Sequence, residues 1–125
     1  MSEVLHYEMH DSTLAGIELE GADALLIFEW LAGRTLDWED RFAPARLRLH
    51  NADMDALAPA LAWRFPVALY GGSVLGSDGA VLDPAWSEDA PSIDIFAIEL
   101  DPRDGSGLIA VRASALTLTW CPTPP

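Results

Sequence analysis

The chain has 125 residues, half of them hydrophobic and 22% charged, which excludes an intrinsically disordered protein and fits a single domain with its own core. Twenty acidic residues face seven basic ones, all arginine, so the formal net charge is −13 at pH 7. A charge of this sign repels phosphate backbones, which excludes nucleic acid as a partner. It is explained first as a means of keeping the protein soluble, and second by a basic protein or peptide, or a cation, as the partner.

The cellular compartment is predicted from cysteine usage and from the start of the chain. Cys121 is the only cysteine, so no disulfide can form within the chain. The first residues contain no basic stretch followed by an apolar one, as a secretion signal would. The longest purely apolar run, residues 24–28, is too short to span a bilayer. We therefore expect a cytoplasmic protein without a membrane partner.

Short apolar runs separated by glycine, aspartate and proline predict an all-β domain. In TLAGIELEGADALLIFEWL one run ends at Glu20 and the next begins at Ala24, which predicts a hairpin. The second arm is apolar on both faces, so we expect a central strand that is covered on both sides. In the next run, ARLRLHNA, the alternation points the leucines inward and the arginines and His50 outward.

The middle of the chain is less regular than its two ends. Asp53 or Asp55 would suit the start of a short helix, but Pro59 would remove a hydrogen bond from its interior, so we expect an irregular or single-turn connection. DPAWSEDAPS is predicted to be a loop. The runs SIDIFAIELD and LIAVRAS flank the turn PRDG and predict a second hairpin, followed by the strand ALTLTW. Residues 1–121 are expected to form one domain and residues 122–125 a proline-rich tail.

About seven to nine short runs of this kind predict an antiparallel β-sandwich of two packed sheets, with at most one short helix. A β-barrel is the alternative. We favour the sandwich because a strand that is apolar on both faces fits between two layers more easily than in a barrel with a wet exterior.

Near the start of the chain, His10, Asp11 and Ser12 are consecutive and suggest a hydrolase. A catalytic triad needs its three side chains within hydrogen-bonding reach of one another. On a strand, however, His10 and Ser12 share one face and Asp11 points to the other. The polar side chains are better explained as hydrogen-bonding local backbone groups, so no catalytic residue is assigned.

A metal site is the second possibility for the same histidines. His6 and His10 have the spacing of two ligands on one face of a helix, but no helix is predicted there. In an extended chain the two imidazoles are too far apart to bind one ion. The remaining candidate ligands are His10, Asp11 and His50, which would have to converge from neighbouring strands.

The five tryptophans suggest binding surfaces. Trp30 and Trp120 lie in apolar strand patterns and are predicted to be core residues. Trp38 and Trp86 lie in acidic stretches, where an aromatic ring suits the recognition of arginine or lysine on a partner. The alternative, of equal weight, is that each ring folds back and covers the end of the sandwich. The candidate binding residues are therefore these two tryptophans and their acidic neighbours: Trp38, Glu39, Asp40, Trp86, Glu88 and Asp89. The sequence around Trp63 fits either a core residue or a binding residue.

The motifs of common cofactor sites are missing from the sequence. It contains no glycine-rich nucleotide loop, no cysteine pair for zinc and no calcium-binding loop, so no cofactor is expected.

The segments MHDSTLAGIELEGADALLIFEW, FAIEL and LIAVRASALTLTW resemble those of small bacterial all-β proteins that open on a His-Asp-Ser strand start. Some of these proteins are described as immunity proteins of polymorphic toxin systems. The resemblance covers both ends of the chain and not residues 52–92. It implies a β-sandwich without catalytic residues.

Three functions follow from these observations, in order of preference. The first is a non-enzymatic interaction domain that binds a basic protein partner, with assembly of several copies as the alternative form of interaction. The second is a small-molecule or carbohydrate binder whose pocket uses Trp38, Trp63 or Trp86. The third is a metal-dependent or hydrolytic enzyme built on His10, Asp11 and His50.

Overall fold

The computed structural model describes residues 5–35, 37, 39–87 and 90–120. Ten antiparallel strands form a single sheet in the order β7-β10-β3-β2-β1-β4-β8-β9, with β5 paired to β4 and β6 paired to β1. The strands are β1 (Leu5–Glu20), β2 (Asp23–Thr35), β3 (Asp40–His50), β4 (Val67–Leu75), β5 (Val81–Leu82), β6 (Ala85–Trp86), β7 (Ser92–Asp94), β8 (Ala97–Pro102), β9 (Ile109–Arg112) and β10 (Ala115–Trp120). A short helix, α1 (Met54–Leu61), follows β3.

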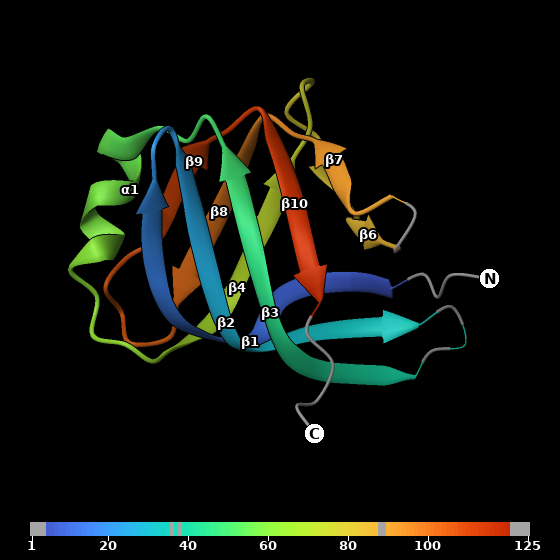
Figure 1. Ribbon diagram of the computed structural model, residues 1–125. Helices are drawn as coiled ribbons and strands as arrows, with labels where there is room; N and C mark the ends of the chain where they lie inside the picture. Colours follow the sequence, from blue (N-terminus) through green and yellow to red (C-terminus); the bar gives the residue numbers. More distant parts are fainter. Residues whose placement is uncertain (1–4, 36, 38, 88–89, 121–125) are drawn as a thin grey trace.

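The sheet folds back on itself around one hydrophobic core. Strands β10, β3, β2 and β1 form the near layer in Figure 1, and β4, β8 and β9 lie behind them. The predicted two-sheet sandwich is not shown, because β1 pairs with β4 at Thr13 and Leu14 and joins the two layers into one sheet. The alternative barrel is not formed either, since the sheet ends at β7 and β9 without closing. Ten strands are present where about seven to nine were predicted.

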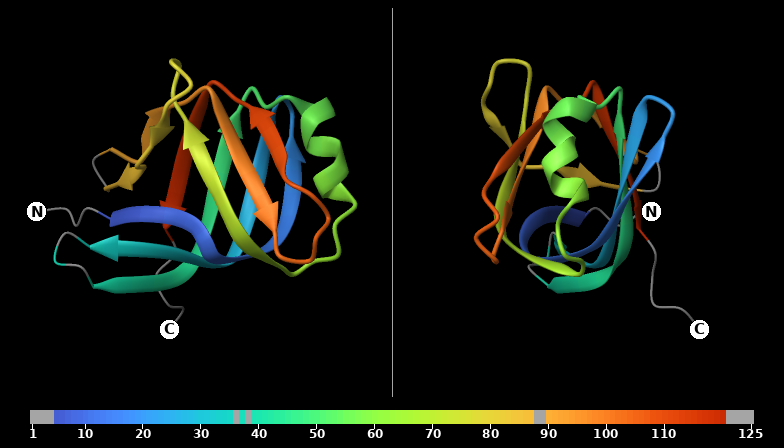
Figure 2. Two further views of the ribbon diagram at one scale, coloured as in Figure 1. Left: turned by 180° about the vertical axis from the view of Figure 1, so that it is seen from behind. Right: turned by 90° about the vertical axis from the view of Figure 1, so that its left-hand side faces the viewer.

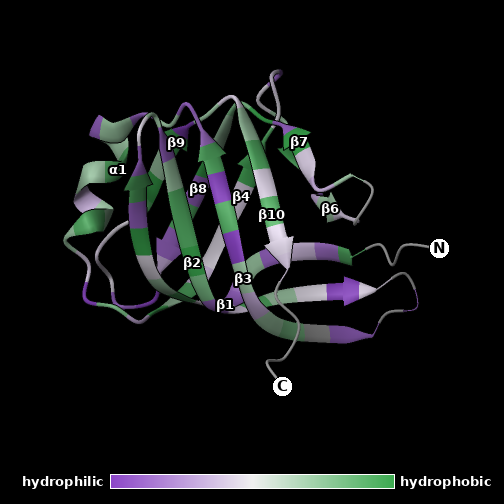
Figure 3. Cartoon of the chain, viewed as in Figure 1, coloured by the Kyte–Doolittle hydropathy of each residue, from purple (hydrophilic) through white to green (hydrophobic). Residues whose placement is uncertain are grey.

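The predicted hairpin, the central position of β2 and the alternation of β3 are confirmed, but Leu19 of β1 is 51% exposed and, among the described strands, no second sheet covers the outer face of β2. The β1–β2 hairpin turns at Gly21 and Ala22, between the paired residues Glu20 and Asp23. Gly21 has a φ of +62°, a conformation that glycine adopts without a steric cost. Hydrophobic and hydrophilic bands alternate along β3 in Figure 3. Leu47 and Leu49 are fully buried, while Arg46 and Arg48 lie on the opposite, solvent-facing side of the strand.

Several irregularities interrupt the pairing of β1, β2 and β3, and two of them bear on the site. The first lies in β1 between Glu8 and Thr13, where Asp11 has a φ of +65°. The second lies in β2 between Phe28 and Leu31. A bulge of this kind reverses which face the following side chains occupy. The prediction that Trp30 is a core residue is therefore wrong: the ring is 45% exposed, while Leu31 is buried in the core.

The connection after β3 is a two-turn helix rather than the irregular segment predicted. The Asp53 carboxylate caps α1 by accepting a hydrogen bond from the Ala56 N–H. Pro59 is tolerated because it costs a single backbone hydrogen bond and lies on the exposed side, while Leu57 and Ala60 are buried in the core. The helix covers one end of the space between the two layers (Figure 2).

The C-terminal prediction is confirmed in part. The run SIDIFAIELD is not one strand, because β7 pairs with β10 while β8 pairs with β9, and the predicted loop DPAWSEDAPS contains the short strand β6. β8 and β9 form the expected hairpin, with Ala97 opposite Arg112. β10 follows and pairs with β3 along its whole length. The predicted tail, residues 122–125, and Cys121 lie outside the described residues. Nowhere in the described part of the chain is a helix long and apolar enough to cross a membrane.

Candidate functional site

The His-Asp-Ser motif forms the bulge in β1, and Ser12 holds that bulge in place. The Ser12 hydroxyl donates to the Glu8 carbonyl at 2.9 Å and accepts from the Ala32 N–H at 2.9 Å. Its side chain is buried, so these two backbone groups are its partners. The local hydrogen bonding predicted for Ser12 is confirmed, and the hydroxyl is engaged rather than available as a nucleophile.

Asp11 does not bond to local backbone as predicted. Its carboxylate accepts a hydrogen bond from the Arg103 guanidinium at 3.0 Å and lies 3.0 Å from His10 Nδ1. All three side chains are largely exposed, so these ion pairs are weak. They connect the bulge in β1 to the turn after β8.

The three candidate metal ligands are not brought together. Leu49 pairs with Ala24, which pairs with Leu19, so the end of β3 lies nine positions along β1 from His10. At about 3.3 Å per residue, this separation prevents His50 from sharing an ion with His10 or Asp11. Within the described ranges, no three His, Cys, Asp or Glu side chains are grouped so that they could hold a metal ion.

His50 instead lies in the middle of a chain of polar contacts across the outer face of the near layer. Its Nδ1 is 3.6 Å from Asp23 Oδ2, and its Nε2 is 2.7 Å from Thr117 Oγ1. The Thr117 hydroxyl is in turn 2.6 Å from Ser92 Oγ. These polar contacts therefore link β2, β3, β10 and β7. Sequence reasoning placed His50 on this face but missed the other three residues, which come from distant segments.

The contacts from Asp23 through His50 to Thr117 have the acid, imidazole and hydroxyl order of a hydrolase triad, but their surroundings do not fit that chemistry. A triad needs backbone N–H groups pointing at a developing oxyanion. β10 is paired with β3 on one edge and with β7 on the other over residues 115–117, so the neighbouring N–H groups belong to the sheet. This series of polar contacts is accordingly a structural link between strands.

The pH dependence of stability should reveal the role of Asp23. The Asn51 N–H donates to its carboxylate at 3.1 Å, and the Arg48 guanidinium adds a second bond; together they hold the pKa of Asp23 below its ordinary value. A carboxylate with a lowered pKa in the folded chain stabilises the fold above about pH 4, and this contribution is lost as the pH falls through the folded pKa. Acidification should therefore lower the melting temperature less in Asp23→Asn than in the wild type.

Thermal unfolding followed by circular dichroism between about pH 6 and pH 2.5 checks this difference. Asp94→Asn, which removes an exposed carboxylate outside the chain of contacts, is the control. Parallel curves for the wild type and Asp23→Asn would contradict the assigned role.

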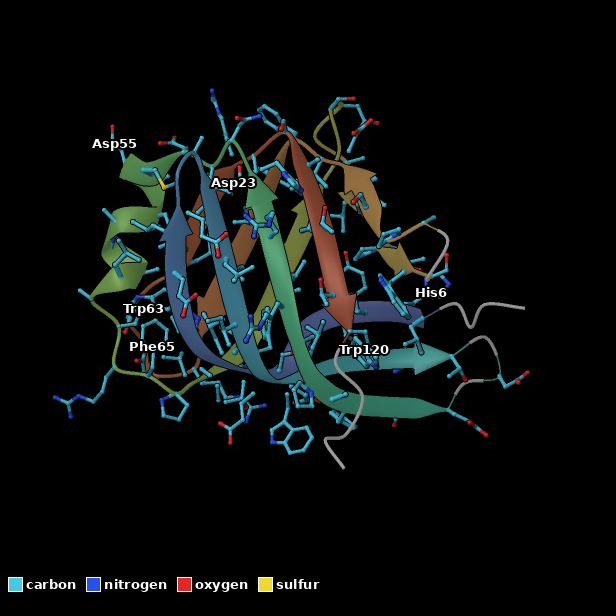
Figure 4. All side chains as sticks on the ribbon, in the orientation of Figure 1. His6, Asp23, Asp55, Trp63, Phe65 and Trp120 are labelled. Atoms are coloured by element: carbon cyan, nitrogen blue, oxygen red, sulfur yellow. The ribbon has the colours of Figure 1, made fainter. Side chains whose placement is uncertain are left out.

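The tryptophans are distributed differently from the prediction. Trp86 and Trp120 stack with their ring centroids 6.5 Å apart, and both pack against the core as half-buried residues. Figure 4 shows Trp120 at the end of β10, and Trp63 near α1, where it packs partly buried against the core. Trp38, Glu88 and Asp89 lie outside the described residues.

The described members of the two predicted binding segments, Glu39, Asp40 and Trp86, lie at the same end of the molecule. β6 pairs with β1 at Leu5, and the other edge of β1 pairs with β2 at Thr35. Trp86 and the end of β2 at Thr35 therefore flank the start of β1. Glu39 and Asp40 are exposed in that turn and at the start of β3.

At this end, three strands extend beyond the rest of the sheet (Figures 1 and 2). We call this part the extension: residues 5–8 of β1, 30–35 of β2 and 40–44 of β3. Strand alternation places His6 and Glu8 on its outer face, together with Trp30, Ala32 and Arg34 of β2 and with Asp40 and Phe42 of β3.

The outer face of the extension carries two exposed aromatic rings in an acidic setting. Trp30 is 45% exposed and Phe42 is 52% exposed. Phe42 is opposite Ala32, which follows Trp30 by two positions on the same face, so the rings flank an alanine that is only 4% exposed. The carboxylates of Glu8 and Asp40 lie 3.8 and 3.6 Å from the Arg34 guanidinium between them.

A cavity of about 290 Å³ lies at the base of the extension. It opens between Tyr7–Met9 of β1, Gly72–Val74 of β4 and the segment Val81–Pro84. Burial raises the pKa of the Tyr7 hydroxyl on its wall, so this phenol remains neutral at all physiological pH values. Of the predicted pocket tryptophans that the structure describes, neither Trp63 nor Trp86 lines this cavity.

The sequence contains no signal for this cavity, because its walls come from three separate segments without a motif. The exposure of Trp30 was also missed, and only the bulge in β2 reveals it. No family model, curated protein or solved structure matches the chain.

Proposed function

We propose that the protein is a non-enzymatic interaction domain that binds a basic protein partner on the outer face of the extension. The observation that carries the proposal is the pair of exposed rings, Trp30 and Phe42, within a group of carboxylates. Exposed aromatic rings are typical anchors of protein interfaces, and they also attract arginine and lysine side chains.

The charge of the whole chain supports a partner of this sign. A net charge of −13 attracts a basic protein over long range and repels another acidic surface. The acidic residues predicted as binding residues, Glu39 and Asp40, lie at the same end as the extension and extend its negative field. Inhibition of a basic toxin, with which the excess negative charge is compatible, is one form of this function.

Replacing the two rings should weaken binding to the physiological partner by about thirtyfold or more, or about 2 kcal/mol, because interface energy concentrates in buried aromatic anchors. The test is affinity capture from an extract of the source organism with the wild type and with the double variant Trp30→Ser, Phe42→Ser. Captured proteins are identified by mass spectrometry and titrated in purified form by calorimetry.

Tyr70→Ser is the matched control, because Tyr70 is a still more exposed ring that lies on β4. A basic protein that binds the wild type and Tyr70→Ser equally, binds the double variant weakly and dissociates as salt rises from about 0.05 to 0.5 M supports the proposal. A partner whose affinity the double variant leaves unchanged overturns it, as does an interface formed only between copies of this acidic chain.

A further inference from the structure

The cavity at the base of the extension exists because β1 leaves part of one edge unpaired by its neighbours. β1 pairs with β6 at Leu5 and His6 and with β4 only at Thr13 and Leu14. Between these points the Tyr7 N–H donates to the Pro84 carbonyl, which closes one side of the opening. The result is a cavity in the sheet that is continuous with the solvent.

The wall of the cavity combines apolar surface with two carboxylates. Tyr7, Met9 and Val74 are buried residues and form part of its inner wall. Glu8 and Asp83 also line it, and because their side chains are 56% and 82% exposed they stand at its mouth. The site therefore offers an apolar interior, an aromatic ring and a negatively charged entrance.

Its size and its charge restrict the ligand. A volume of about 290 Å³ is at the lower limit for a drug-sized ligand and suits a single long side chain. A metal ion would find too few donors, since no group of three suitable side chains exists among the residues described. An organic cation with an aliphatic stem satisfies both the carboxylates and the apolar wall.

We propose that the cavity binds an arginine side chain of the basic partner. The inference rests on the proposed function, and Glu8 provides the connection, because it belongs both to the outer face of the extension and to the mouth of the cavity. A guanidinium forms two parallel hydrogen bonds with a carboxylate, and the aliphatic stem of an arginine suits an apolar wall.

The groups that now face the Glu8 and Asp83 carboxylates do not prevent these carboxylates from binding an arginine of the partner. Glu8 lies 3.8 Å from the Arg34 guanidinium, and Asp83 lies 3.3 Å from His6 Nδ1. The Glu8–Arg34 contact is an exposed ion pair, which contributes little to stability and is readily replaced. The Asp83 side chain is 82% exposed, and His6 Nδ1, which is itself buried, makes no hydrogen bond to it.

The test is a titration of the ¹⁵N-labelled protein with N-acetyl-arginine amide, which carries the side chain without a charged backbone. We expect saturable shifts of the amide signals of Tyr7, Ser73 and Leu82 with a dissociation constant of about 1 mM. The corresponding citrulline derivative, which has the same shape without the charge, should not bind. Asp83→Asn should weaken binding about fivefold or more. Asp78→Asn, in the β4–β5 turn and outside the cavity, should bind like the wild type.

Three results would overturn the assignment: no saturable shift at the cavity up to about 20 mM, equal binding of citrulline, or equal binding by Asp83→Asn. The outcome is separable from that of the proposed function. If arginine fails to bind here while a basic partner still requires Trp30 and Phe42, only the cavity assignment falls. If arginine binds here and no basic partner is captured, the cation site stands and the proposed function falls.

Discussion

Replacing Gly72 by alanine is expected to destabilise the protein by about 3 kcal/mol, the upper end of what overpacking a core costs. Gly72 lies in β4, opposite Leu100 of β8. A Cβ built at this position would lie 2.9 Å from Met9 Cβ and Cγ and closer still to the Glu99 carbonyl oxygen. That oxygen belongs to the neighbouring strand, so relief of the clash requires the β4–β8 pairing to separate locally.

Chemical denaturation of Gly72→Ala and Gly71→Ala measures this effect with a control in the same strand. A Cβ at Gly71 meets no atom within 4 Å, so Gly71→Ala should differ from the wild type by less than about 0.5 kcal/mol. Equal unfolding free energies for the two variants would show that β1 and β8 do not approach β4 as closely as described.

Ser12→Ala is expected to lower the unfolding free energy by about 2 kcal/mol. The substitution removes the acceptor of the Ala32 N–H and leaves that donor buried without a partner. It also removes the bond to the Glu8 carbonyl that fixes the two ends of the bulge relative to each other. The large cost arises because a buried unsatisfied donor loses its hydration without compensation.

The measurement is again chemical denaturation, with Ser77→Ala as the control for removal of an exposed hydroxyl. Amide hydrogen exchange adds a local test, because the Ala32 amide should lose protection more than the rest of β2. A Ser12→Ala protein as stable as Ser77→Ala would mean that the hydroxyl is not needed for the bulge.

The elements of this fold were accessible from the sequence where a local pattern determines them. The alternation in ARLRLH, the glycine turn after Glu20 and the turn after β8 each act over a few residues, and each prediction is confirmed. The bulge around Trp30 was not accessible, because nothing in LLIFEWL marks the residue at which the alternation reverses. The capping role of Asp53 was recognised, but the cost of Pro59 was overestimated.

Features that depend on distant segments were beyond local reasoning. A single folded sheet differs from a sandwich by the two pairs of residues that join β1 to β4. No local signal marks Thr13 and Leu14 as the residues of β1 that form these pairs. The contacts of His50 with Asp23 and Thr117 likewise require three strands to be in register. The cavity was missed for the same reason, because it is a space between segments rather than a pattern within one.

The strands at the two margins of the sheet, β7 and β9, affect how readily copies of the protein associate by strand addition at high concentration. An unpaired margin can template the addition of a strand from another molecule and so start aggregation. β7 has only three residues and β9 only four. The Arg112 carbonyl on β9 is already occupied by the Asp53 N–H. Neither of these two margins offers a run long enough for intermolecular strand addition.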